Sequence, residues 1–230
     1  MVGGRPADTS KARVWIDALP GVDAEMAKRR RIEKHSSQHA AGINNILEVA
    51  VDVGRRLASL KIPYCFIGGI ACQRWGEPRQ TVDVDATIFV GFGNESTVVD
   101  ELLSLYQARM EGARDFAIQH RILLLTSDRG TGIDLSLGGM PFERRLVDRS
   151  VAWHIQRHGS IRICSAEDLV VLKAFASRPQ DWIDVEKVIV RQGSRLDRKL
   201  ILEELTPLAE LKEEPDILDR LHELFHNNDT

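Results

Sequence analysis

"YCFIGGIACQRWGEPRQTVDVDATI", Tyr64 to Ile88, places two carboxylates inside what reads as a β-strand. An apolar run ends in the glycine pair Gly68–Gly69, a short segment follows, and a second apolar run carries Asp83 and Asp85. This order predicts a short buried strand, a short helix, and a second strand that contains both aspartates. The chemistry of that second strand is the first question that the sequence raises.

Alternation along the second strand separates its charged residues from its apolar ones. Successive side chains of a strand point to opposite faces, so Asp83 and Asp85 share one face, and Val84 and Ala86 share the other. The two carboxylates then lie roughly 6–7 Å apart along the strand and repel each other unless a cation lies between them or one is protonated. Mg²⁺ is commonly held by carboxylates together with substrate phosphates. We therefore interpret the pair as a metal–phosphate site, with the solvated outer face of an edge strand as the alternative.

Two further features favour the metal–phosphate interpretation. Gly68 and Gly69 lie between a strand and a helix, where a chain without Cβ atoms lets a phosphate approach the N–H groups of the helix N-terminus. Asp134 interrupts the later apolar strand "GIDLSL", on the face opposite its apolar neighbours. A lone aspartate in such a strand needs a partner, and a metal shared with the first two aspartates would supply one.

The remaining sequence predicts a mixed α/β half followed by a helical half. Apolar residues recur at helical spacing over residues 41–60 and 96–106, which predicts two helices. "FAIQHRILLLT" (116–126) and "GIDLSLG" (132–138) are predicted strands, and "SDRGT" between them suggests a hairpin. "RSVAWHIQRHGSIRICS" predicts two more short strands. Helices are then predicted near residues 166–177, 180–192, 197–208 and 212–226.

At this point the sequence resembles a known family. "GGIACQRWGEPRQTVDVDATI" is similar to the signature of the nucleotidyltransferase superfamily (DNA polymerase β-like fold), in which a glycine pair opens a helix, a D-x-D pair follows, and a third aspartate lies on a later strand. "DLVVLKAFASRPQDWIDVEKVI", Asp168 to Ile189, resembles the AbiEii-type and minimal nucleotidyltransferase branch. The resemblance covers about Pro63 to Val190. It implies an α/β (α+β) class fold with a small mixed β-sheet flanked by helices, followed by a C-terminal helical region.

The resemblance also implies roles for individual residues. Gly68 and Gly69 would hold the nucleotide triphosphate through backbone contacts. Asp83 and Asp85 would bind two Mg²⁺ ions, for which Mn²⁺ could substitute. Asp134 would complete one metal site and could accept the proton of the attacking hydroxyl.

A second group of candidates lies in the helical half. The resemblance implies that Lys173 meets the triphosphate or the catalytic carboxylates, whose repulsion it would offset. Asp184, with Asp181 as a further candidate, would orient that lysine or contact the nucleotide. Capping of a helix start is the alternative for Asp181, because acidic residues are favourable there. Arg79 is expected to continue the polar face of the aspartate strand and to contact the nucleotide.

Composition limits the class of protein. The chain has 230 residues and a formal net charge of −3, which argues against a polycation that coats nucleic acid. The 3 cysteines lack C-x-x-C spacing and are expected to be buried in a reducing compartment. No apolar run approaches the ~18 residues of a membrane span, and the N-terminus lacks the apolar core of a signal peptide. A cytoplasmic protein without a membrane partner is expected.

Three parts are predicted along the chain. Residues 1–35 would form a flexible N-terminal arm, residues 36–164 the nucleotidyltransferase α/β core, and residues 165–230 a helical region that completes the active-site cleft. Within the arm, the basic run "KRRRIEKH" is expected to begin a solvated helix, with an RNA or phosphate contact as the alternative.

The expected function is metal-dependent transfer of a nucleoside monophosphate from an NTP substrate to an acceptor, which could be tRNA, protein or a small molecule. The AbiEii-like resemblance suggests the toxin of a type IV-like toxin–antitoxin system, with an antitoxin protein as partner. Fold-level analogy does not settle function. One alternative is a catalytically inactive nucleotidyltransferase-fold binding protein. Another is a metal-dependent phosphoesterase, which would need histidine ligands near the carboxylates.

Overall fold

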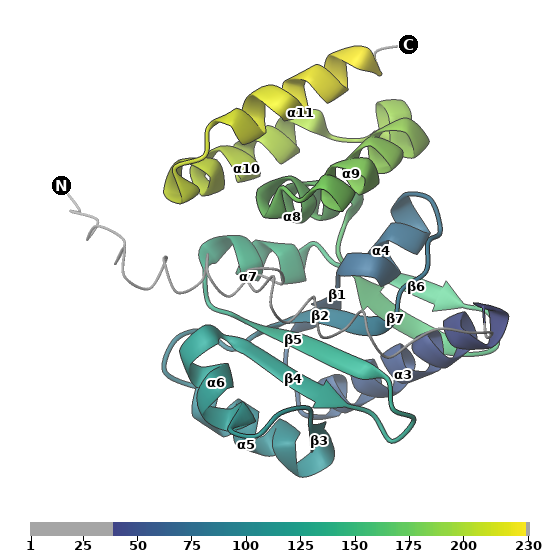
Figure 1. The fold of residues 1–230 in the computed structure, drawn as a ribbon, viewed down its shortest axis with the longest axis vertical. Coiled ribbons are helices and arrows are strands. Elements are labelled where there is room, and N and C mark those ends of the chain that lie inside the picture. Colours follow the sequence, from purple (N-terminus) through teal and green to yellow (C-terminus); the bar gives the residue numbers. More distant parts are fainter. Residues whose placement is uncertain (1–38, 229–230) are drawn as a thin grey trace.

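A seven-stranded mixed sheet forms the centre of the computed structural model, which describes residues 39–228, with side chains from Asn45 onward (Figure 1). The strand order is β3-β4-β5-β2-β1-β7-β6. Pairs β2–β5 and β1–β7 are parallel, and the other pairs are antiparallel. The predicted class, a mixed sheet flanked by helices, is confirmed. The strands are β1 Tyr64–Phe66, β2 Asp83–Phe89, β3 Gln107–Ala108, β4 Ile122–Thr126, β5 Gly132–Gly138, β6 Val151–Ile155 and β7 Gly159–Ile163.

Helices cover both faces of the sheet. The described helices are α3 His39–Ser59, α4 Gly68–Trp75, α5 Glu95–Leu105, α6 Ala113–His120, α7 Pro141–Asp148, α8 Ala166–Ala176, α9 Pro179–Gln192, α10 Arg198–Lys212 and α11 Asp216–Asn227, with a short 3-10 turn at Gly193–Arg195. Figure 1 shows α8 to α11 stacked as one body above the sheet, with α4 and α7 between them and the strands. The helical half is thus docked on the α/β half through α4 and α7.

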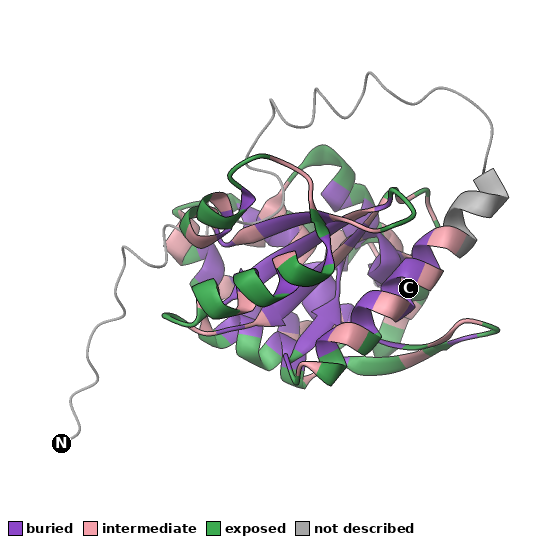
Figure 2. Ribbon diagram, turned by 90° about the horizontal axis from the view of Figure 1, so that it is seen from below, coloured by how far each residue is buried: buried purple, intermediate pink, exposed green. Residues whose placement is uncertain are grey.

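The two faces of the sheet belong to different hydrophobic cores. Val84, Ala86 and Ile88 of β2 pack with α3, α5 and α6, as the predicted alternation requires. The other face packs under α4, α7 and the C-terminal helices, and Phe89 of β2 lies against that second core. Figure 2 shows the buried strands enclosed between helices whose outer surfaces are exposed. Because Asp83 and Asp85 alternate with the first set, they lie on the face of β2 that packs against α4 and α7.

One predicted strand is wrong in its first half. Residues 116–126 were expected to be extended, but Ala113–His120 form α6 and β4 begins only at Ile122. Arg121 between them has a φ of 55°, the left-handed conformation that commonly ends a helix. Apolar residues in such a run fit a helix or a strand, and periodicity alone does not separate them. Helix α7, which begins with a favourable first-turn proline, was not predicted.

Most other elements agree with the sequence. The hairpin of β4 and β5, the β6–β7 pair and the four C-terminal helices are all present. Ser165 caps α8, because its hydroxyl accepts a hydrogen bond of 3.0 Å from the Asp168 N–H. The three cysteines are buried and unpaired. The arm at residues 1–35 and its basic run lie outside the described residues. Within residues 39–228, no helix is long and apolar enough to cross a bilayer.

A buried network of ion pairs ties α7 to the helical half. Arg149, at the end of α7, donates to Asp168 Oδ1 at 2.5 Å and Oδ2 at 3.1 Å, and to Glu204 Oε1 at 2.7 Å. Arg145 donates to the same Glu204 at 2.8 and 2.6 Å. The Asp168 side chain is only 1% exposed, and Arg149 is its ion-pair partner. Hydrogen bonds and attraction from the two arginines hold the pKa of Glu204 below its ordinary value.

Removing Arg149 is therefore expected to loosen the contact between the two halves. Arg149→Ala should lower the free energy of unfolding by about 3–5 kcal/mol, because it leaves a buried carboxylate without its cation. Arg144 of the same helix pairs with Asp148 at 2.9 Å on the exposed surface, so Arg144→Ala should cost far less. Chemical denaturation of both variants measures the difference. Equal losses would show that the buried network does not stabilise this junction.

Candidate active site

Asp85 and Asp134 lie side by side on neighbouring parallel strands. The register pairs Asp85 of β2 with Asp134 of β5, and Asp83 with Gly132. Neighbouring strands are about 4.8 Å apart, so the three predicted metal ligands occupy one patch of the sheet face, called here the carboxylate patch. The side chain of Asp134 is 8% exposed and that of Asp83 is 17% exposed. The patch is therefore largely withdrawn from water, where charge interactions are stronger.

The glycine pair lies at the border of the carboxylate patch. Strand β1 runs antiparallel to β2, so its end meets the start of β2, and the Ile67 N–H donates to the Asp85 carbonyl at 3.0 Å. Gly68 has a φ of 58°, and a Cβ on it would lie 2.4 Å from Asp85 Oδ2. A Cβ on Gly69 would lie 2.4 Å from the Thr81 hydroxyl. The missing Cβ atoms thus let two side chains from β2 and its lead-in approach the start of α4.

Arg109 lies among these carboxylates and was not predicted. Its Nη2 forms a short ion pair with Asp134 Oδ1 and donates to the Ile133 carbonyl at 3.2 Å. Its Nη1 is 3.9 Å from Asp83 Oδ1. Arg109 follows β3, two strands away from β5, so no local motif marks it. Only the register of β3 on β4 and of β4 on β5 reveals its position.

The carboxylate patch fits a divalent cation in its chemistry but already contains a cation. Carboxylate oxygens are the ligands that Mg²⁺ prefers, and Gly132 leaves room for one of them, since a Cβ there would lie 2.2 Å from Asp83 Oδ1. In the described part of the chain, no group of three or more His, Cys, Asp or Glu side chains is arranged to hold a metal ion. Arg109 supplies the positive charge between Asp83 and Asp134 in this arrangement.

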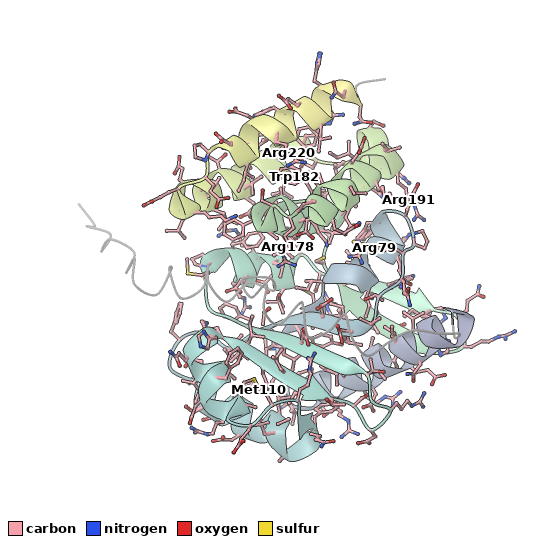
Figure 3. All side chains as sticks on the ribbon, viewed as in Figure 1. Arg79, Met110, Arg178, Trp182, Arg191 and Arg220 are labelled. Atoms are coloured by element: carbon pink, nitrogen blue, oxygen red, sulfur yellow. The ribbon has the colours of Figure 1, made fainter. Side chains whose placement is uncertain are left out.

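The predicted lysine belongs to a second cluster, in the helical half. Lys173 Nζ lies 2.6 Å from Asp181 Oδ1 and 2.9 Å from Asp184 Oδ2. Arg79 Nε donates to Asp184 Oδ1 at 3.1 Å, and its Nη2 lies 3.1 Å from Oδ2. Arg79 therefore does not extend the polar face of the aspartate strand: β2 begins only at Asp83, and the arginine turns toward α9. In the view of Figure 3, Arg79 and Arg178 lie where α9 meets the α/β half, and Met110, the neighbour of Arg109, lies far below them.

Opposite charges fix the protonation of this second cluster. Burial alone would lower the pKa of Lys173, but Asp181 and Asp184 raise it above its ordinary value. Burial alone would raise the pKa of Asp184, but Lys173 and Arg79 lower it. Burial raises the pKa of the neighbouring Cys72 thiol to about 11. At neutral pH the cluster therefore contains a charged lysine, a charged carboxylate and a neutral thiol.

A short segment connects the two clusters. Arg79 is bound to Asp184, and two residues later Thr81 covers Gly69 and donates to the Asp83 carbonyl at 3.2 Å. Helix α4, which the glycine pair opens, packs against β2, α8 and α9. The two groups of candidate residues are thus neighbours through α4, but the ion pairs of Lys173 join it to α9 and not to the carboxylate patch.

Comparison with known proteins gives similarity in structure only. No family model and no curated protein sequence matches the chain. An antigenic nucleotidyltransferase-like protein from Paracoccidioides brasiliensis aligns with a TM-score of 0.47 and 19% identity, over 77% of this chain and 93% of its own. The antibiotic-resistance factor ANT(2'')-Ia aligns with a TM-score of 0.45 and 14% identity, over 79% of this chain and 98% of its own. At these values neither similarity assigns a function to the chain.

The close approach of Asp85 to Gly68 can be tested by substitution. Gly68→Ala should lower the free energy of unfolding by about 2–5 kcal/mol, because it adds left-handed strain and a clash with Asp85. Gly130, in the β4–β5 turn, has a φ of 75° but no atom within 4 Å of an added Cβ. Gly130→Ala should therefore show the strain alone, about 1–2 kcal/mol. Urea denaturation compares the two, and equal losses would rule out a packing role for Gly68.

The ion pairs of Asp184 should make the stability of the protein depend on pH. Asp184→Asn should lower the free energy of unfolding at pH 7 by up to about 3–5 kcal/mol, because two cations lose a buried partner. The folded pKa of Asp184 is depressed, so its contribution is present above its unfolded pKa of about 3.9 and is lost as pH falls through the lower folded value. The difference between wild type and variant should thus be constant from pH 7 to about 5 and shrink below about 4. Denaturation curves across this range measure it; a difference that persists undiminished at pH 3 contradicts the assignment.

Proposed function

We propose that this chain is a metal-dependent nucleotidyltransferase that transfers a nucleoside monophosphate from an NTP to an acceptor. The observation that carries the proposal is the pairing of Asp85 with Asp134 across β2 and β5, with Asp83 on the same face and Gly68 at the border. The order of these elements along the chain resembles the signature of the nucleotidyltransferase superfamily. The carboxylate patch lies on the sheet face that packs against α4 and α7, and α4 in turn packs against α8 and α9 of the helical half.

Asp83, Asp85 and Asp134 would hold the metal ions, Mg²⁺ or in its place Mn²⁺. Two such ions, when bound, stabilise the charge on the attacking and leaving oxygens of an in-line displacement. The start of α4, at Gly68 and Gly69, would bind triphosphate oxygens through backbone N–H groups, whose dipole favours anions. The protein's own contribution is mainly to position the substrates and to neutralise charge.

The proposed reaction is a nucleotidyl transfer, an attack at the α-phosphorus of the NTP. The oxygen of an acceptor hydroxyl forms a bond to the α-phosphorus of the NTP, while the bond from that phosphorus to the bridging oxygen breaks. Pyrophosphate leaves with the electron pair of the broken bond. The hydroxyl proton passes to a carboxylate of the patch, for which we propose Asp134, because it lies beside Asp85 on the adjacent strand.

The second cluster would serve the nucleotide. Asp184 holds Lys173 and Arg79 together, and we propose that it orients both cations toward the triphosphate. Arginine binds phosphate in a bidentate manner and lysine binds it as a point charge. Asp181 shares Lys173 with Asp184, so it assists that orientation.

The acceptor and the cellular role extend this proposal. On the resemblance of Asp168–Ile189 to the AbiEii-type branch, we propose a cytoplasmic toxin of a type IV-like pair, with an antitoxin protein as its partner. tRNA, a protein or a small molecule would be the acceptor. The acidic net charge of −3 mildly favours a smaller acceptor over a large RNA.

One observation favours a different function. Arg109 pairs with Asp134 and lies near Asp83, which would suit a protein that keeps the fold and binds a partner but has lost catalysis. In that case the guanidinium is a permanent counter-ion of the carboxylates. Activity measurements separate the two functions.

The direct test is transfer from labelled NTPs. Purified protein should label a component of total tRNA or cell extract with one of the four α-labelled NTPs in the presence of Mg²⁺. Asp85→Asn should lower that transfer by at least about 100-fold, as for other groups that stabilise transition-state charge directly. Asp100 pairs with Arg114 on the exposed surface, so Asp100→Asn should leave it unchanged.

Two results would contradict the proposed enzymatic function. Undiminished transfer by Asp85→Asn would exclude the carboxylate patch as its site. No transfer by the wild type with any NTP or acceptor fraction would favour the inactive binding protein.

A further inference from the structure

Arg109 reaches the carboxylate patch along a row of residues that crosses the sheet. Its N–H donates to the Leu124 carbonyl at 3.0 Å, which extends the pairing of β3 with β4 by one residue. Leu124 pairs with Asp134, and Asp134 pairs with Asp85. Paired residues of adjacent strands place their side chains on the same face. The arginine stem therefore passes over Leu124, and its guanidinium arrives at Asp134.

The guanidinium also approaches the neighbouring pair of residues on the same face, Asp83 of β2 and Gly132 of β5. Its Nη1 is 3.9 Å from Asp83 Oδ1, while its Nη2 contacts Asp134 and the Ile133 carbonyl. Gly132 makes this approach possible, because a Cβ there would lie 2.2 Å from the Asp83 carboxylate and 3.0 Å from Arg109 Nη1. One cation thus lies between two carboxylates that belong to different strands.

A divalent cation would need the same oxygens. Carboxylates this close repel one another, and a cation between them relieves the repulsion. Mg²⁺ binds its ligands at about 2.0–2.1 Å in octahedral geometry, so it would compete with the guanidinium for Asp134 Oδ1 and repel it as a like charge at short range. We propose that Arg109 holds the place of a divalent cation between Asp83 and Asp134, and that this cation displaces it on binding. The proposal rests on the proposed function, since it takes these carboxylates as metal ligands.

The location of Arg109 allows its side chain to move away from the carboxylate patch. It lies in the loop between β3, an edge strand of two residues, and α6, and its side chain is 26% exposed. Arg121 provides a contrast: its side chain is 5% exposed and it donates to the carbonyls of Leu137 and Gly91 as well as to Glu95. Because the backbone of Arg109 is bonded to β4, its side chain can swing toward solvent without breaking the pairing of β2 with β5, whereas the side chain of Arg121 is enclosed by protein.

Competition between Arg109 and a metal has a measurable consequence. Arg109→Gln removes the competing charge, so the affinity of the nucleotide-free protein for Mn²⁺ should increase by about 5- to 150-fold, the usual range of coupling between two ligands. Arg109→Lys keeps the charge and should stay close to the wild type. Arg114→Gln removes an arginine of α6 whose pair with Asp100 is exposed, and should not change Mn²⁺ affinity. Isothermal titration calorimetry, with electron paramagnetic resonance of free Mn²⁺, gives the dissociation constants.

Thermal unfolding provides a readout that a merely structural arginine would not give. Without metal, Arg109→Gln should melt below the wild type, because the carboxylate repulsion is no longer offset. Saturating Mn²⁺ should then raise the melting temperature more in the variant than in the wild type. Equal Mn²⁺ affinity in both proteins, or weaker affinity in the variant, overturns the proposal.

Wild-type protein allows the same test should Arg109→Gln not fold. Titration of Mg²⁺ into ¹⁵N-labelled wild type should shift the guanidinium signals of Arg109, identified with Arg109→Lys, toward those of a solvated arginine. Signals unchanged at Mg²⁺ saturation overturn the proposal. None of these measurements includes an NTP. Tighter Mn²⁺ binding without any nucleotidyl transfer would therefore reject the proposed function alone, and transfer with no change in Mn²⁺ affinity would reject the role of Arg109 alone.

Discussion

Repulsion among carboxylates on two adjacent parallel strands is the constraint on which the candidate site depends. The register of β2 on β5 places Asp85 beside Asp134 at the distance of neighbouring strands, with Asp83 two residues away. The side chains of Asp83 and Asp134 are only 17% and 8% exposed, and this burial makes the repulsion stronger than it would be in water. A fold that keeps this register must supply positive charge at this point of the sheet. Arg109 is the cation found between Asp83 and Asp134, and it approaches from the edge of the sheet.

The helical half faces a related requirement. Its helices stack on α4 and α7, and the carboxylates that they bring to this junction, Asp168, Asp184 and Glu204, are buried and need partners. Arg149 pairs with Asp168 and Glu204, and Arg79 pairs with Asp184. Each arginine comes from the α/β half and each carboxylate from the helical half. These pairs give the junction directional contacts in addition to apolar packing, and they fix the position of α9 relative to the start of β2.

The sequence predicts what depends on local pattern. Alternation in β2 and β5 correctly separates Val84 and Ile133 from the aspartates, and punctuation by proline and glycine correctly separates the C-terminal helices. Alternation fails where an apolar run fits both a helix and a strand, which is why α6 was read as part of β4. It also gives no information on sheet order. Arg109 could not be predicted for that reason, because its place beside Asp134 follows from two successive strand registers.

The glycines show how backbone geometry and charge meet at this site. Gly68 and Gly69 open α4 and Gly132 begins β5, yet each lacks a Cβ at the point where a side chain of β2 or its lead-in needs the space. The space over Gly68 accommodates Asp85, that over Gly132 accommodates Asp83, and that over Gly69 accommodates Thr81. Carboxylates packed against bare backbone have few rotamers available, so strands and a helix start fix where their oxygens point. A site held by such rigid elements needs little reorganisation when a cation or a phosphate arrives. The glycine pair therefore restricts the aspartates as well as opening α4, and both effects favour charge binding at the same place.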